Sequence, residues 1–188
     1  MTVKSVIKLA CLFLGLDEIS ECNVFNTSGE SPTKVEQKEI DTLVRCLNIV
    51  LQEIATSFID VVGEKDVDFK NGKYPLNEID DKFLEVLYVS VNGKKIKFKE
   101  KMDFLFADAD SAKVVYRKYP QIVDIDDTCP NFNFKLAEKT LAYGVAMEYS
   151  FVNSLSDEAS IFENRYKNDL LIATRKNGEK RLKCRRWL

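Results

Sequence analysis

The chain has 188 residues, of which 45% are hydrophobic and 31% charged, the balance of a globular protein with a substantial core. Its net charge of −2 argues against a wholly basic nucleic-acid-binding protein. The absence of histidine excludes the Ser-His-Asp and Cys-His catalytic machineries and the commonest metal ligand. The five cysteines never stand at C-x-x-C spacing, so neither a zinc ribbon nor a redox motif is expected.

An amphipathic helix is predicted at the N-terminus, over about residues 2–15. Its apolar residues recur at steps of three and four, and Gly15 is a suitable stop. Cys11 lies within this apolar pattern, as Cys46 does in the next one, and both are predicted to fill the core. The apolar run is too short to span a bilayer and is interrupted by Lys4 and Lys8, so we expect no membrane segment. Residues 17–33 are polar and predict a loop.

A second, longer helix is predicted over about residues 33–60, with Ser31 as its N-cap and Pro32 in the first helical position. It carries the strongest periodic signal in the chain, because its apolar residues follow a helical spacing almost without interruption. These residues are Ile40, Leu43, Val44, Leu47, Val50, Leu51, Ile54 and Phe58.

The pattern then changes to that of a β insert, over about residues 66–119. Asn71-Gly72 and Asn92-Gly93 are turn signals, and the second follows a run rich in β-branched and aromatic residues, 83–91. Lysines alternate with apolar residues from Lys94 to Lys99, which favours an edge strand whose lysines face solvent; a phosphate-facing surface is the alternative. We expect three to five short strands in a small antiparallel meander.

Helical periodicity returns in the last third, with helices predicted over about residues 133–153 and 157–176. Asn153-Ser154 separates them and Ser156 is a candidate cap for the second, so they should pack as an antiparallel hairpin. The expected fold class is α+β: a helical bundle of about four helices with an inserted small antiparallel β-meander and an extended C-terminal tail. Residues 1–175 are expected to form a single domain.

The C-terminal arm, residues 176–188, is strongly basic. Residues 175–188 carry seven basic side chains and one acid, Glu179, a net charge of +6 that leaves −8 for the remainder. The only tryptophan of the sequence, Trp187, follows two arginines, a composition typical of an interface. The arm is therefore predicted to dock on a partner; a solvated chain end and direct contact with nucleic acid are the alternatives. The predicted docking residues are Lys180, Arg181, Lys183, Arg185, Arg186 and Trp187.

Catalytic chemistry finds little support in the sequence. Aspartates cluster at 66/68, 80/81, 108/110 and 124/126/127, but such residues in loops are usually solvated, and no phosphate-binding, nucleophile-elbow or EF-hand motif is present. We expect a non-enzymatic protein with no cofactor and no metal.

The C-terminal third resembles the head-tail adaptor, or connector, proteins of tailed bacteriophages. The resemblance lies in the segment LAEKTLAYGVAMEYSFVNSLSDEASIFENRYKNDLLIATRK, residues 136–176, and in RRW at 185–187. In that family an LAYGVAxEY-type helix is followed by an EAxxFxxRYxxxL segment. The N-terminal half is similar only in its order of elements.

The resemblance implies a structural virion protein at the head-tail interface, made in the cytoplasm of a bacterial host. Such adaptors form a twelvefold ring beneath the portal protein, extend the DNA channel and present a surface to the next tail or ring protein. Packaged DNA passes through the channel without specific binding, and the C-terminal arm docks against the portal. The alternatives are a small nucleic-acid-binding regulatory protein using the basic tail and the lysine-rich hairpin, and a histidine-free hydrolase using paired aspartates and a metal.

Overall fold

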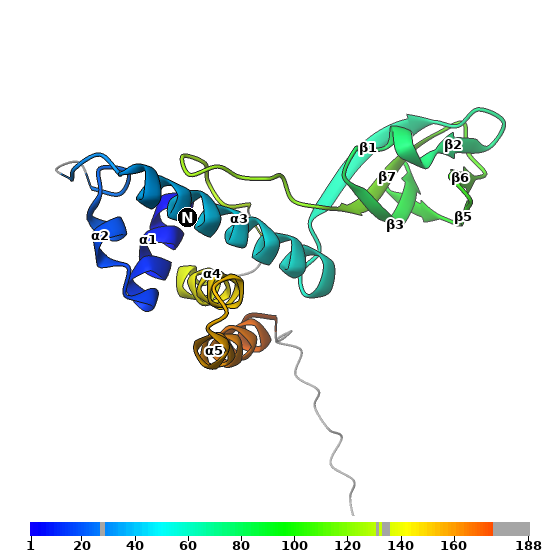
Figure 1. Cartoon of the computed structure of the whole chain (residues 1–188). Coiled ribbons are helices and arrows are strands. Elements are labelled where there is room, and N and C mark those ends of the chain that lie inside the picture. Colours follow the sequence, from blue (N-terminus) through cyan, green and yellow to red (C-terminus); the bar gives the residue numbers. More distant parts are fainter. Residues whose placement is uncertain (27–28, 131, 133–135, 175–188) are drawn as a thin grey trace, which may run out of the picture.

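The computed structural model describes residues 1–26, 29–130, 132 and 136–174, and it confirms the α+β class. Within this part of the chain there are five helices: α1 (Val3–Leu14), α2 (Asp17–Glu21), α3 (Lys34–Ser57), α4 (Glu138–Val152) and α5 (Ser156–Thr174). The strands all lie between α3 and α4. Figure 1 shows the helices gathered at one end of an elongated molecule and the β insert at the other, beyond the C-terminal end of α3. No helix in the described ranges is long and apolar enough to cross a membrane.

Helix α4 is the centre of the helical body. It packs against α1, α3 and α5 and is buried on most of its circumference, as expected for a helix that is apolar all round. Gly144 stands at its closest contact with the neighbouring helices: a Cβ there would lie 2.8 Å from Val50 Cγ1 and 3.0 Å from Tyr166 Cε2. Cys11 and Cys46 are buried in this core, as predicted.

Helix α3 begins at Lys34, close to the predicted start, but the predicted N-cap was wrong. Thr33, rather than Ser31, is the N-cap: its side chain accepts from the backbone N–H of Glu36, whose carboxylate accepts from the N–H of Thr33 in return. This reciprocal capping box satisfies two otherwise unpaired donors, which a cap at Ser31 followed by Pro32 does not. The helix ends at Ser57, three residues before the predicted end, and a short helix, α2, forms within the predicted loop 17–33.

The last two helices form the predicted pair, broken at Ser154, which has a left-handed backbone with φ of 61°. Helix α4 begins at Glu138 rather than 133, and residues 133–135 of the predicted helix lie outside the described residues. Helix α5 covers 156–174, close to the predicted 157–176. Its buried side chains are Ala159, Tyr166 and Leu170.

The β insert is larger than predicted and is not a simple meander. Seven strands lie in the described residues, forming a four-stranded sheet of order β1-β7-β3-β4 and a three-stranded sheet of order β2-β6-β5, all pairs antiparallel. The strands are β1 (Val62–Asp68), β2 (Lys73–Pro75), β3 (Phe83–Val91), β4 (Lys94–Ile96), β5 (Phe98–Lys101), β6 (Phe104–Ala107) and β7 (Ser111–Lys118). The insert begins at 62 rather than 66, because Gly63 and Glu64 pair with β7.

The predicted hairpin around Asn92-Gly93 is confirmed. Both turn residues have positive φ, 48° and 78°, as a primed two-residue turn requires, and Val91 pairs with Lys94. The lysine-rich run splits into two consecutive edge strands, β4 in one sheet and β5 in the other. Its position at a sheet edge therefore agrees with the prediction.

Each half of the molecule has its own hydrophobic cluster. One fills the helical body, and the other lies in the β insert, around Val89, Leu105 and Val114. The prediction that residues 1–175 form one domain stays a prediction. The insert is tied to the helices at its base, where Arg117 of β7 reaches the end of α3 and the returning chain follows α3 back. Asn48 pairs with both main-chain polar groups of Val123 in this returning segment, at 2.9 and 2.8 Å.

Candidate functional site

The predicted docking residues all belong to the C-terminal arm and lie outside the described residues. They are Lys180, Arg181, Lys183, Arg185, Arg186 and Trp187. Their role as a docking site stays a prediction. The described part of the chain offers three other surfaces with a distinct chemical character: an apolar face on the last two helices, an acidic hollow beside α2, and a lysine-bearing edge of the β insert.

The apolar face lies on the outer side of α5 and at its turn with α4. Six exposed hydrophobic side chains make up this α4–α5 apolar face: Phe151, Val152, Leu155, Ile161, Leu171 and Ile172. Ile161 and Ile172 are eleven residues apart, about three helical turns, and so lie on one side of α5. Ile172 keeps 66% of its surface exposed. The sequence analysis did not predict this face. The eleven-residue spacing of Ile161 and Ile172 was the one sequence feature that could have indicated it.

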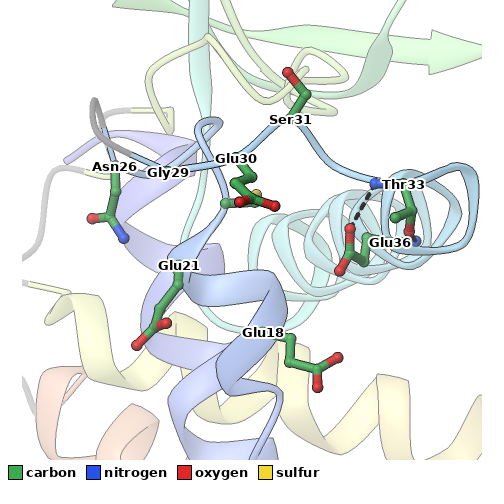
Figure 2. A pocket seen from close by; sticks show the side chains of 9 residues that line it. Glu18, Glu21, Asn26, Gly29, Glu30, Ser31, Thr33 and Glu36 are labelled. Atoms are coloured by element: carbon green, nitrogen blue, oxygen red, sulfur yellow. Dashed lines mark hydrogen bonds between the residues drawn. The ribbon is translucent and has the colours of Figure 1, made fainter.

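The second surface is a hollow of about 540 Å³ between α2, the loop after it and the start of α3. Figure 2 shows the side chains that line it. Four glutamates contribute, Glu18, Glu21, Glu30 and Glu36, and the lining residues include no basic side chain. The hollow therefore has a negative electrostatic potential that suits a cationic group.

The loop that forms this hollow is held by close backbone contacts. Asn23 donates from its N–H to the carbonyl of Glu30 at 2.8 Å, and Lys8 donates to the Asn26 side chain at 2.6 Å. Gly29 passes so near the end of α2 that a Cβ would lie 2.2 Å from the Glu21 carbonyl oxygen. Only glycine fits such an approach.

The glutamates of the hollow do not form a metal centre. In Figure 2 the carboxylates of Glu18 and Glu21 are directed to different sides, and that of Glu36 turns back to the N–H of Thr33. Across the described ranges no three histidine, cysteine, aspartate or glutamate side chains are grouped so that they could hold a metal ion.

One aspartate of the predicted solvated clusters has a structural role instead. Asp80 accepts from the hydroxyl of Tyr116 at 2.8 Å, from Lys118 Nζ at 3.2 Å and from the N–H of Lys82 at 2.9 Å. Burial opposes ionisation of this carboxyl, but these hydrogen bonds outweigh it and lower the pKa of Asp80 below its ordinary value. Asp80 thus joins the segment before β3 to β7, and these hydrogen bonds give it a structural role.

Tyr143 of α4 packs between helices. Its ring stacks on Phe13 of α1 with centroids 4.7 Å apart, and the guanidinium of Arg165 lies 5.6 Å from the ring centre. These contacts tie α1 and α5 to α4. A packing role therefore accounts for this residue.

The lysine-bearing edge combines positive charge with aromatic rings. The run from Lys94 to Lys101 contains five exposed lysines and one acid, Glu100. Lys95 Nζ lies 4.1 Å from the ring centre of Tyr88, and Lys73 Nζ lies 5.2 Å from that of Phe104. Such an arrangement can contact anionic groups and flat rings.

Compared with known proteins, the chain matches no family model and no curated protein sequence.

Proposed function

We propose that this protein is a head-tail adaptor, a structural virion component that forms a ring beneath the portal, extends the DNA channel and docks the tail. The proposal starts from the resemblance of residues 136–176 to such adaptors. The observation that carries it furthest is the α4–α5 apolar face, because it lies on the same two helices as the resemblance.

Exposed hydrophobic side chains lie toward both ends of α5, at Ile161 and at Leu171 and Ile172, with the polar Arg165 and Asn168 exposed between them. Clustered exposed apolar surface is typical of an interaction surface. Ile161, Leu171 and Ile172 contribute nothing to the core of their own chain. Burial against a neighbouring subunit would remove their apolar surface from water, at a gain of about 25 cal/mol per Å². In a ring each subunit uses two different surfaces, one toward each neighbour, and α5 is a candidate for one of them.

The charge distribution supports contact with further partners. Residues 1–174 carry −8 and the C-terminal arm is basic, so the arm would suit an acidic surface on the portal while the net negative charge of the body opposes adhesion to packaged duplex DNA. The β insert extends from the helical body (Figure 1) and could reach a neighbour that the helices do not touch.

The apolar face is tested by introducing a charge on it. In the virus that encodes the chain, we expect Ile172→Asp to leave the subunit folded but to prevent its incorporation, so that heads accumulate without tails. A matched control is Ile122→Asp, since Ile122 is 70% exposed and lies in the returning segment, away from α5.

Normal infectious particles with Ile172→Asp would count against the assignment of α5 to an assembly interface. Equal loss of particles with Ile122→Asp would show that the effect is not specific to the α4–α5 apolar face. Circular dichroism of both purified variants establishes that the chain is folded in each case.

A further inference from the structure

We propose that the outer face of the three-stranded sheet, β2-β6-β5, binds single-stranded nucleic acid. This site goes beyond the proposed adaptor function and does not depend on it. It is defined as the Phe–Lys face and consists of Lys73, Pro75, Lys99, Lys101, Phe104 and Phe106.

The strand register places these residues on one side of the sheet. Phe106 pairs directly with Lys73 of β2 and with Lys99 of β5, and Phe104 pairs with Pro75 and Lys101. Residues directly opposite in antiparallel strands point to the same face, and alternate residues of one strand point to opposite faces. Leu105, between the two phenylalanines, is completely buried in the core of the insert. Phe104 and Phe106 therefore point outward, with lysines on either side.

The two rings form a small aromatic platform. Their centroids are 6.5 Å apart, and Phe106 keeps 37% of its surface exposed although a core lies directly beneath its strand. Aromatic side chains on a sheet face accept nucleobases by stacking, and this contact tolerates every base because each has a π-face. The two rings are tilted by 58° to one another and Lys73 Nζ lies over the Phe104 ring, so Phe106 is the ring that offers an open face for stacking.

Hollows adjoin both ends of the platform. One of about 630 Å³ is lined by Phe106, Lys99 and Asp108, among others, and one of about 180 Å³ by Phe104, Lys73 and Asp68, among others. Both hollows contain aromatic rings and two lysines, and the larger has one carboxylate whereas the smaller has two, from Asp68 and Glu78. A lysine suits a phosphate, and a carboxylate accepts hydrogen bonds from the exocyclic amine of a base.

The positive charge of this edge is not neutralised by its own strand. Glu100 is the single acid among residues 94–101. Its carboxylate accepts a hydrogen bond from the N–H of Val86 in β3 at 3.2 Å, so it is directed to β3 and not to the neighbouring lysines. The lysines at 97, 99 and 101 remain exposed beside the platform. A partner must therefore be anionic, and repeated phosphates joined to flat bases meet both the charge and the rings.

An acidic peptide meets these requirements less well. It offers carboxylates to the lysines but no flat base that stacks on Phe106 while its exocyclic amine donates to Asp68 or Asp108 in the hollows. A duplex also fits less well, because its paired bases are stacked on one another and cannot lie on the two rings. Single-stranded nucleic acid is the ligand class that uses every feature of the face.

The test is fluorescence anisotropy of the full chain with a fluorescein-labelled single strand of alternating dA and dC, about 20 nucleotides long, whose bases carry exocyclic amines and whose length exceeds one such binding site. Phe106→Ala should weaken binding about tenfold, the effect expected for loss of one stacked base. The double variant Lys99→Gln/Lys101→Gln should also weaken binding and reduce the slope of log K against log salt by about 1.4, since each contact to single strands contributes about 0.7. The matched control Lys34→Gln/Lys38→Gln removes the same charge from exposed positions on α3.

Three outcomes would overturn the proposal. The first is binding of the dA/dC single strand that Phe106→Ala and the 99/101 variant leave unchanged, which would assign the binding to the basic arm or another surface. The second is equal affinity for a duplex of the same length, with no effect of Phe106→Ala. The third is tighter binding of labelled poly-glutamate, dependent on the same lysines, which would make the partner an acidic protein segment.

Discussion

Arg117 of β7 donates from Nη2 to the carbonyl oxygen of Thr56 at 3.0 Å, and so joins the β insert to the C-terminal end of α3. The same nitrogen donates to the carbonyl of Ala55 at 3.2 Å, and Nη1 donates to Glu85 at 2.7 Å. Nε lies 2.8 Å from a carboxylate oxygen of Asp60. A positive charge at the exposed carbonyls of a helix end is favourable, because the helix dipole is negative there. One side chain thus holds α3, the linker and two strands.

Replacement of Arg117 by alanine should destabilise the protein and loosen the insert. Loss of hydrogen bonds to a partly exposed cation is expected to cost about 2 kcal/mol in free energy of unfolding. Urea unfolding measures this loss, and limited proteolysis should detect faster cleavage between α3 and β1. Lys113→Gln is the control, because it removes an exposed pair with Glu64 and should cost less than about 1 kcal/mol. Equal effects of the two variants would contradict the role assigned to Arg117.

A methyl group at Gly144 should destabilise the helical body. Alanine favours a helix over glycine by about 1 kcal/mol, but here the added Cβ would lie 2.8 Å from Val50 Cγ1. Overpacking of this kind typically costs about 1–3 kcal/mol, so the melting temperature of Gly144→Ala should fall. Asn168→Ala, on the exposed side of α5, should change it little. A higher melting temperature for Gly144→Ala would show that α3 and α5 can move apart at no cost.

The start of α3 offers a comparison of two neighbouring residues. Thr33→Ala removes the capping box and should lower the free energy of unfolding by about 1 kcal/mol. Ser31→Ala leaves the box intact and should have a much smaller effect. The reverse order, measured by thermal or urea unfolding, would restore Ser31 as the cap that the sequence suggested.

Glu148 should make stability depend on pH. Burial, and then the carboxylate of Glu53, raise the pKa of Glu148 in the folded protein. A raised carboxyl pKa means that the folded state holds the proton more tightly than the unfolded state. The contribution of Glu148 to stability is therefore fully present below the ordinary pKa of glutamate and is lost as pH rises from there through the folded-state value.

The Glu148→Gln variant removes this titration. It should unfold at a temperature higher than the unaltered protein by up to about 3 °C near neutral pH, a shift appropriate to a half-buried group. The difference should disappear at pH values below the ordinary glutamate pKa. Glu21→Gln, at an exposed position, is the control. A Glu148→Gln variant that is less stable at neutral pH would show that the charged carboxylate has a favourable partner.

The sequence predicted well those elements whose signal is local. The periodicity of Ile40 to Ile54 located α3, and Asn92-Gly93 located a hairpin, because helix faces and primed turns each depend on residues close together in the chain. Residues such as Gly63 gave no such signal: β1 starts there because β7, over fifty residues later, supplies its hydrogen-bond partners. The strand order and the second sheet likewise depend on pairing between strands that are distant in the sequence, so no local pattern predicts them.

The candidate surfaces were harder to predict than the fold. The lysines around Lys97 were recognised as an edge, but the Phe–Lys face requires the register that sets Phe106 opposite Lys73 and Lys99. The α4–α5 apolar face was overlooked because Ile161 and Ile172 resemble core residues in a sequence, and only burial separates them from Tyr166 and Leu170. The C-terminal arm stays a sequence-based prediction.

The adaptor proposal is tested most directly by quantitative mass spectrometry of purified particles of the virus that encodes this chain, with the portal protein as the internal standard. The account predicts that the chain is present in a one-to-one ratio with the portal subunit, as a ring beneath a portal of equal symmetry requires. Absence of the chain from infectious particles would contradict it.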